Sequence, residues 1–223
     1  MEKRSILPGK GIKITISSKE KGITISPEKL KIRLEGKPIS AEVKEIGLVY
    51  LVVDCSTSMG EGDKLDQAKR GILNFAKDAL AKGYLTGLIK FESSAMHLCG
   101  PQKEISILRS YLENIYFSGS TNMTKAIYLA TQRLLKRHGF RVMVIATDGM
   151  PDNPMTTLDA AQKAKEDGID IIAIGTDDAD QEFLQKLASR TKLGVKVSRE
   201  QFEKGITSTA KMLPQLGPGK KGR

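Results

Sequence analysis

The sequence contains no tryptophan and few aromatic residues of any kind, with 6 Phe and 5 Tyr among 223 residues. Any hydrophobic core must therefore be built mainly from aliphatic side chains. Hydrophobic residues make up 39% of the chain and charged residues 28%, which is typical of a soluble globular protein. This composition excludes intrinsic disorder and fibrous repeats.

Long hydrophobic runs and a cysteine framework are also missing. The longest uninterrupted apolar run, Leu48–Val53, has six residues, whereas a membrane helix needs about 20. The first thirty residues contain no apolar core of the roughly 7–15 residues found in signal peptides. The chain has only two cysteines, Cys55 and Cys99, too few for a disulfide framework. We therefore expect a cytoplasmic protein with reduced thiols and no membrane partner.

The formal net charge is +10, but the excess is concentrated at the two ends of the chain. Residues 1–46 carry +5 and residues 214–223 carry +3, which leaves only +2 for the residues between them. A nucleic-acid-associated protein that uses these basic termini is therefore an alternative function. The scarcity of aromatic residues and the scattering of the N-terminal charges make it the less favoured one.

The hydrophobic pattern divides the chain into three parts. In residues 1–45, apolar and polar residues alternate with the period of a half-buried strand, which predicts two to four short antiparallel strands and a turn at Glu35–Pro38. Residues 46–213 form the main predicted domain. Residues 214–223 are predicted to be a basic flexible tail.

In the main domain, strand patterns alternate with helical patterns. Predominantly apolar segments at 49–53, 140–146 and 169–174 are typical of strands buried on both faces of a parallel sheet. Two further runs, 85–91 and 95–99, are close enough to form a hairpin. Helical spacing recurs between the strands, and the amphipathic segment 199–213 predicts a last helix. The predicted fold is an α/β domain whose mainly parallel sheet has one antiparallel edge strand and helices on both faces.

Polar residues gather where three of these elements meet the carboxyl edge of the sheet, the edge at which open α/β sheets bind ligands. Asp54, Ser56 and Ser58 follow the first buried strand, Thr121 precedes a helix, and Asp148 follows the second buried strand. Hydroxyl and carboxylate oxygens are the ligands that hard cations such as Mg²⁺ prefer. At any single position a helix cap or a turn would explain the residue, but five in this order favour a metal site.

These residues resemble the metal-ion-dependent adhesion site of the von Willebrand factor type A domain, in its intracellular prokaryotic form. The family pattern is D-x-S-x-S in the first loop, Thr in the second and Asp in the third, and the resemblance covers Ile46 to about Leu213. It implies a Rossmann-like, doubly wound sheet that holds Mg²⁺, with Mn²⁺ or Ca²⁺ as alternatives. It also implies that an Asp or Glu carboxylate of a partner protein completes the coordination of the ion, so that the protein acts as an adaptor in an intracellular assembly.

Four of the eight methionines lie close to the predicted metal loops. Met59, Met123 and Met150 each follow a loop residue within one or two positions, and Met155 is a little further on. Methionine is common on surfaces that adapt to partners. We therefore predict an apolar partner-binding rim of Met59, Met123 and Met150, although Met59 and Met123 could equally begin helices and pack inward.

The sequence contains few motifs that would indicate an enzyme. The chain has neither a P-loop nor a G-x-G-x-x-G motif after the first strand, and the second Asp of haloacid-dehalogenase phosphatases is replaced by Ser56. His97 and His138 are predicted to be structural, because neither follows a buried strand. We expect no catalysis, and a metal-dependent phosphohydrolase is the weakest alternative.

Overall fold

The computed structural model describes residues 31–34, 37–40 and 46–216. The chain divides into two units, Met1–Glu45 and Ile46–Arg223. In the first unit, β1 (Lys31–Leu34) pairs with β2 (Lys37–Ser40) in an antiparallel ladder. Lys37 and Pro38 therefore belong to a strand and not to the predicted turn. The other predicted N-terminal strands lie outside the described residues.

The second unit is built on a six-stranded sheet with the order β5-β4-β3-β6-β7-β8. All neighbouring strands are parallel except β4 and β5, which form an antiparallel hairpin at one edge. The strands are β3 (Gly47–Asp54), β4 (Tyr84–Phe91), β5 (Ala95–Gln102), β6 (Phe140–Thr147), β7 (Asp170–Gly175) and β8 (Gly194–Lys196).

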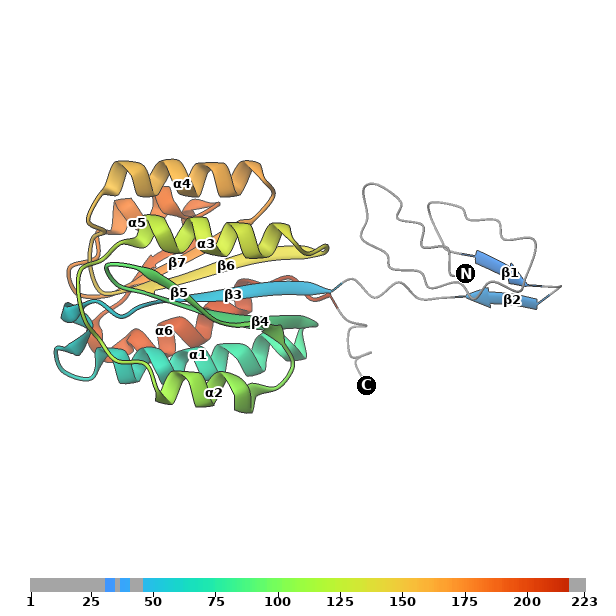
Figure 1. Cartoon of the computed structure of the whole chain (residues 1–223), viewed down its shortest axis with the longest axis horizontal. Coiled ribbons are helices and arrows are strands. Elements are labelled where there is room, and N and C mark those ends of the chain that lie inside the picture. The colour runs from blue at the N-terminus through green and yellow to red at the C-terminus, as the bar shows by residue number, and fades with distance from the viewer. Residues whose placement is uncertain (1–30, 35–36, 41–45, 217–223) are drawn as a thin grey trace. The chain divides into compact units, whose positions relative to one another are not determined.

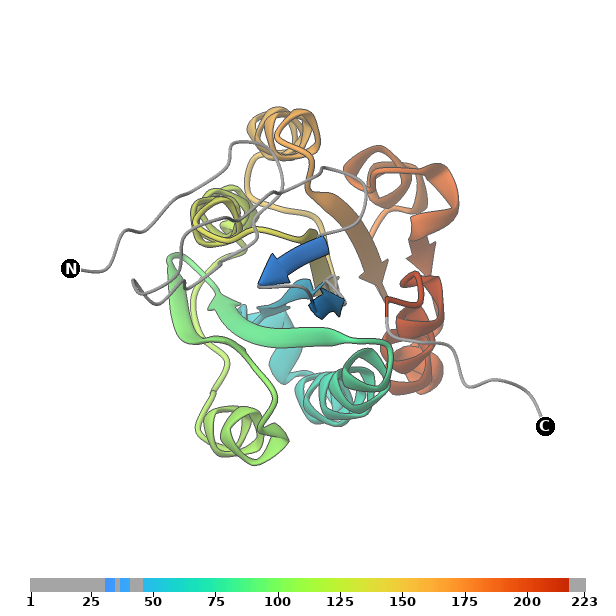
Figure 2. The same ribbon diagram turned by 90° about the vertical axis from the view of Figure 1, so that its right-hand side faces the viewer.

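Helices cover both faces of this sheet, with α1, α2 and α6 on one side and α3, α4 and α5 on the other (Figure 1). The end-on view in Figure 2 shows the same two layers enclosing the strands. The α-helices are α1 (Lys64–Ala81), α2 (Ile105–Glu113), α3 (Met123–Leu135), α4 (Pro154–Glu166), α5 (Gln181–Leu187) and α6 (Phe202–Thr209). Four short 3₁₀ turns are η1 (Thr57–Gly60), η2 (Thr191–Leu193), η3 (Arg199–Gln201) and η4 (Ala210–Met212).

The central position of β3 explains its continuous apolar sequence. It pairs with β4 on one side and β6 on the other, and all eight of its residues are buried. Helices on both faces remove the solvent side that an alternating strand would need. The α/β class, the parallel sheet and the antiparallel edge strand are thus confirmed. The last residue of β3, Asp54, ends at the carboxyl edge, which is where the candidate site is built.

The C-terminal segment differs from the single helix predicted over Arg199–Leu213. It consists of η3, α6 and η4, and the hydroxyls of Thr207, Ser208 and Thr209 each bond back to a carbonyl three or four residues earlier. Such bonds compete with the helical ladder. The predicted tail also begins too early, since the backbone N–H of Leu216 donates to the carbonyl of Lys82 and Leu216 packs against the core.

The two cysteines are free thiols and are both buried. Cys55 follows β3 at the carboxyl edge, whereas Cys99 pairs with Leu88 within the β4–β5 hairpin. In the part of the chain that the structure describes, we find no helix with the length and hydrophobicity of a membrane span.

Close packing of α1 against α6 depends on Gly71, because a Cβ atom built there would lie 2.9 Å from the carbonyl oxygen of Glu203 and 2.9 Å from Cβ of Ile206. We expect Gly71→Val to lower the free energy of unfolding by about 1–3 kcal/mol through overpacking, measured by urea denaturation. Gly100→Val is the matched control, because its nearest neighbour is the Tyr50 hydroxyl at 4.0 Å. Equal stability of the two variants would contradict this account of the α1–α6 contact.

Candidate metal centre

Three loops converge at the carboxyl edge of the sheet and are tied together by backbone hydrogen bonds. The loop after β3 joins the loop before α3 through Ser118 N, which donates to Cys55 O (2.8 Å), and Thr57 N, which donates to Gly119 O (3.1 Å). The loop before α3 joins the loop after β6 through Asp152 N, which donates to Thr121 O (3.0 Å). The structure therefore brings together the three segments that the sequence singled out.

Asp54 is fully buried at the end of β3, and both of its carboxylate oxygens are engaged. Oδ1 accepts from the backbone N–H of Ser56 (2.8 Å), and Oδ2 accepts from the hydroxyl of Thr147 (2.5 Å). Thr147 is the last residue of β6, the strand beside β3. The carboxylate is thus fixed by two neighbouring strands. The role of Thr147 was not predicted, because only the pairing of β3 with β6 brings it to Asp54.

The two serines of the first loop connect Asp54 to the third loop. The hydroxyls of Ser56 and Ser58 lie 3.1 Å apart, and Ser58 Oγ donates to Asp148 Oδ1 (2.9 Å). Ser56 and Asp148 are buried and Ser58 is partly buried. Four of the five predicted ligands are therefore linked in one hydrogen-bonded series from Asp54 to Asp148, in which the backbone N–H of Ser56 joins Asp54 to the two serines.

The fifth predicted ligand, Thr121, is positioned by its backbone. Its N–H donates to Asp152 Oδ1 (2.9 Å), while the other oxygen of Asp152 accepts from the hydroxyl of Ser120 (2.7 Å). The side chain of Thr121 is partly exposed. Asp152 is a supporting residue that the sequence analysis missed, since its position after Pro151 is also typical of an ordinary turn.

Burial strongly affects the acidity of the site. Removal of water raises the pKa of Asp54 to about 6 from its usual 3.8, even though the hydrogen bonds from Thr147 and Ser56 oppose the shift. An ionised carboxylate held without water is stabilised by a nearby cation.

Lys64, a residue that was not predicted from the sequence, supplies a cation for the second buried carboxylate, Asp148. Its side chain is only 2% exposed, and Nζ lies 2.6 Å from Asp148 Oδ2 and 3.2 Å from Asp177 Oδ2. Asp148 Oδ2 makes no hydrogen bond of standard geometry within the described residues, so its link with Lys64 is an ion pair. Burial acts to lower the pKa of Lys64, but the carboxylates of Asp148 and Asp177 outweigh it and raise that pKa. The sequence did indicate that Lys64 is buried. It lies four and eight residues before Ala68 and Ile72, so at helical spacing it shares the buried face of α1 with them.

Asp177, after β7, extends the ion pair to the C-terminal segment. Its carboxylate accepts from Arg199 Nε (2.9 Å) and also pairs with Arg199 Nη2. Hydrogen bonding from Arg199 lowers the pKa of Asp177, and Lys64 adds to this effect. Asp177 has a positive φ of 48°, in the left-handed region that favours glycine, asparagine and aspartate.

The donor set fits a hard divalent cation. The five proposed ligands offer only oxygen atoms, as Mg²⁺ prefers. Three of these residues carry hydroxyls (Ser56, Ser58 and Thr121) and two carry carboxylates (Asp54 and Asp148). No group of three or more His, Cys, Asp or Glu side chains suited to a metal occurs among the described residues. A softer ion would have no nitrogen or sulfur ligand at this edge, since the thiol of Cys55 is buried and directed to Val53 O.

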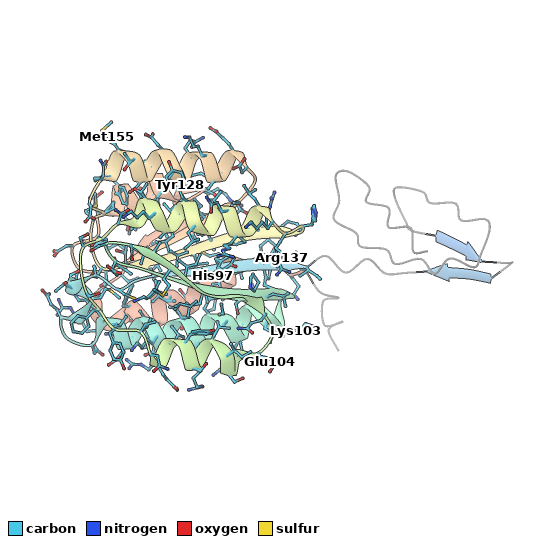
Figure 3. The ribbon with its side chains drawn as sticks, viewed as in Figure 1. His97, Lys103, Glu104, Tyr128, Arg137 and Met155 are labelled. Carbon is cyan, nitrogen blue, oxygen red and sulfur yellow. The ribbon has the colours of Figure 1, made fainter. Side chains whose placement is uncertain are left out.

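The predicted methionine rim is wrong for two of its three residues. Met59 and Met123 are completely buried, because each lies in the first turn after its loop and packs into the core. Met150 is 38% exposed, and Met155 at the start of α4 points away from the domain (Figure 3). The apolar surface that does flank the first loop is aromatic. Phe117 is 49% exposed, and its ring lies 2.5 Å from the position of a Cβ atom built on Gly60.

The chain belongs to the von Willebrand factor type A domain family, whose model matches residues 49–209. The curated relatives are a UPF0353 protein of Mycobacterium ulcerans and another of Mycobacterium marinum, each 29% identical over 150 residues. That match covers 58% of this chain and 44% of each relative, so the chain spans less than half their length.

Solved structures share the fold at low sequence identity. The von Willebrand factor domain of the type V pili tip protein Mfa5 from Porphyromonas gingivalis superposes with a TM-score of 0.71 at 13% identity, covering 81% of this chain and 99% of that one. Proximal thread matrix protein 1 from the mussel byssus, with zinc in its metal-ion-dependent adhesion site, gives 0.66 at 14% identity, covering 78% and 48%. The pilus adhesin SpaC from Lactobacillus rhamnosus GG gives 0.68 at 19%, covering 77% and 31%.

The raised pKa of Asp54 predicts an unusual pH dependence in the absence of divalent ions. The folded protein holds the proton of Asp54 up to about pH 6, whereas the unfolded chain loses it near 3.8, so this group's contribution to stability is lost as the pH rises through that window. The difference corresponds to about 3 kcal/mol.

Asp54→Asn, which removes the charge but keeps the shape, should therefore raise the melting temperature of the metal-free protein at pH 7.5 and leave it little changed at pH 4. Calorimetry in a chelator-containing buffer measures both. A lower melting temperature for the variant at pH 7.5 would contradict the assignment.

Proposed function

We propose that this domain is a divalent-metal-dependent protein-interaction module. Ser56, Ser58 and Thr121 would hold the ion, with Asp54 and Asp148 contributing directly or through water, and an Asp or Glu carboxylate of a partner protein would complete its coordination. The observation that supports this most strongly is the hydrogen-bonded series that joins Asp54, Ser56, Ser58 and Asp148 at the carboxyl edge of the sheet. The ion is proposed to be Mg²⁺, with Mn²⁺ or Ca²⁺ as substitutes.

The ion's coordination also favours binding over turnover. Mg²⁺ requires near-octahedral oxygen coordination, and the protein offers it mainly neutral hydroxyls. A negatively charged ligand from outside is therefore favoured over a further neutral one. We also propose that the protein acts as an adaptor in an intracellular assembly and that it catalyses no reaction.

Three groups that commonly act as bases or nucleophiles are poorly placed for chemistry. His97 lies in β5, where its Nε2 is 2.9 Å from the Tyr50 hydroxyl, and His138 lies between α3 and β6, after α3 has ended. Burial raises the pKa of the Cys55 thiol to about 12, so it stays protonated at neutral pH. Neither histidine nor this thiol is positioned to activate a substrate beside the two acids.

Metal binding can be tested without the partner. Millimolar Mg²⁺ or Mn²⁺ should raise the melting temperature of the wild-type domain, and Asp54→Ala should abolish that rise, because it removes a charge at the centre of the site. Asp159→Ala is a suitable control, since Asp159 is an exposed acid of α4 that is not among the proposed ligands. An equal metal-induced rise in the wild type and Asp54→Ala would refute the proposed centre.

The exposed apolar residues beside the loops should contribute to partner binding and not to metal binding. We expect Met150→Ser and Phe117→Ser to weaken capture of a Mg²⁺-dependent partner about tenfold each, because buried apolar side chains contribute about 1.5–3 kcal/mol. The rise in melting temperature with Mg²⁺ should be unchanged. Leu135→Ser is the matched control, because Leu135 is similarly exposed but ends α3 at the opposite edge of the sheet. Unaltered affinity in both site variants would remove the apolar contribution from the proposal.

A further inference from the structure

Lys64 is the one lysine among the described residues whose side chain is almost entirely buried, and it is buried against a proposed metal ligand. It lies in the first turn of α1, and its ammonium group faces Asp148 and Asp177, with the exposed Glu61 3.5 Å away. Removing a lysine from water costs several kcal/mol unless it is well paired. An apolar residue would continue the stripe of α1 without this cost, so the charge itself calls for an explanation.

The geometry around Asp148 separates its two oxygens. Oδ1 accepts from Ser58 and so faces the proposed ligand set, whereas Oδ2 faces Lys64. The ammonium group and a cation held by the serines would therefore contact different oxygens of one carboxylate. Lys64 can fix the orientation of Asp148 without occupying the place of the ion.

We propose that Lys64 is a positioning residue that also sets the charge of the metal centre, reducing its affinity for the divalent ion while increasing its preference for a carboxylate ligand. This inference rests on the proposed function, because it concerns the ion and the partner carboxylate of that same site.

The charges near the site explain why this matters. Asp54 and Asp148 together carry two negative charges, which would offset the charge of a divalent ion and so weaken the preference for an anionic ligand that the neutral hydroxyls leave to it. Asp177 is already paired with Arg199, so it offsets Lys64 only in part. Lys64 therefore leaves the loaded centre with a net positive charge of about one, and a single partner carboxylate neutralises it.

The inference predicts changes of opposite sign in two variants that leave all five proposed ligands intact. Lys64→Gln keeps a donor for Asp148 but removes the positive charge, so it should bind Mn²⁺ about tenfold more tightly than the wild type. Asp177→Asn leaves Lys64 less neutralised, so it should bind Mn²⁺ about tenfold more weakly. Asparagine tolerates the left-handed backbone at this position, which keeps the loop intact.

The experiment is calorimetric titration of the whole chain with Mn²⁺ alone, with circular dichroism to show that each variant is folded. Lys77→Gln is the control, since it makes the same charge change on an exposed position of α1 and should bind Mn²⁺ like the wild type. A folded Lys64→Gln that binds Mn²⁺ as the wild type does, or more weakly, overturns the inference. If Lys64→Gln does not fold, Asp177→Asn decides, and unchanged or tighter binding in that variant overturns it.

A second measurement tests whether the bound ion prefers a carboxylate to water, with acetate as the probe. The proton relaxation rate of water, which bound Mn²⁺ increases, falls when acetate displaces water from the ion. Acetate should displace water from Mn²⁺ in the wild type, and about tenfold more acetate should be needed in Lys64→Gln. Acetate binding that is equal in the two proteins would overturn the role of Lys64 and leave the proposed function standing. If wild-type protein binds Mn²⁺ but not acetate, carboxylate recognition fails, and with it this part of the inference.

Discussion

The structure of the candidate site depends on burying two carboxylates at the carboxyl edge of a parallel sheet. Asp54 and Asp148 are almost without solvent contact, and burial raises the pKa of Asp54 to about 6 against the opposing effect of its hydrogen bonds. At neutral pH the negative charge must be stabilised by hydrogen bonds or by a cation. Thr147, the serines of the first loop and Lys64 supply this within the chain. A divalent ion would supply more, which is the physical basis of the proposed metal dependence.

The rest of the domain places these groups. β3 and β6 are neighbours in the sheet, so the acid that ends one strand meets the hydroxyl that ends the other. The serine loop is held against the loop before α3, and Asp152 fixes that loop against the third. On the far side, Lys64 and Asp177 connect the site to Arg199 in the C-terminal segment. The site is thus supported from the sheet, from α1 and from Arg199 in η3.

Local pattern was sufficient to predict the fold and to single out the three loops that the structure brings together, because strand burial and loop composition are encoded over short stretches. Metal binding by the five oxygen-bearing residues stays a prediction. Features that depend on packing were missed. For Met59 and Met123 the sequence left a rim position and an inward position equally open, and only the structure shows that each packs into the core. The pairing of Lys64 with Asp148 joins residues 84 positions apart in the sequence. The last helix was predicted as continuous because spacing does not reveal that its hydroxyls bond to its own carbonyls.

The central claim is that the oxygens of Ser56, Ser58, Thr121, Asp54 and Asp148 enclose one divalent ion. Crystals grown with Mn²⁺ would test it most directly, because anomalous scattering locates manganese without reference to the fitted protein. The account predicts one strong anomalous peak at the carboxyl edge of the sheet, on the Oδ1 side of Asp148 and within coordination distance of the serine hydroxyls. A fully loaded crystal with no peak there, or with its peak only at surface carboxylates, would contradict it.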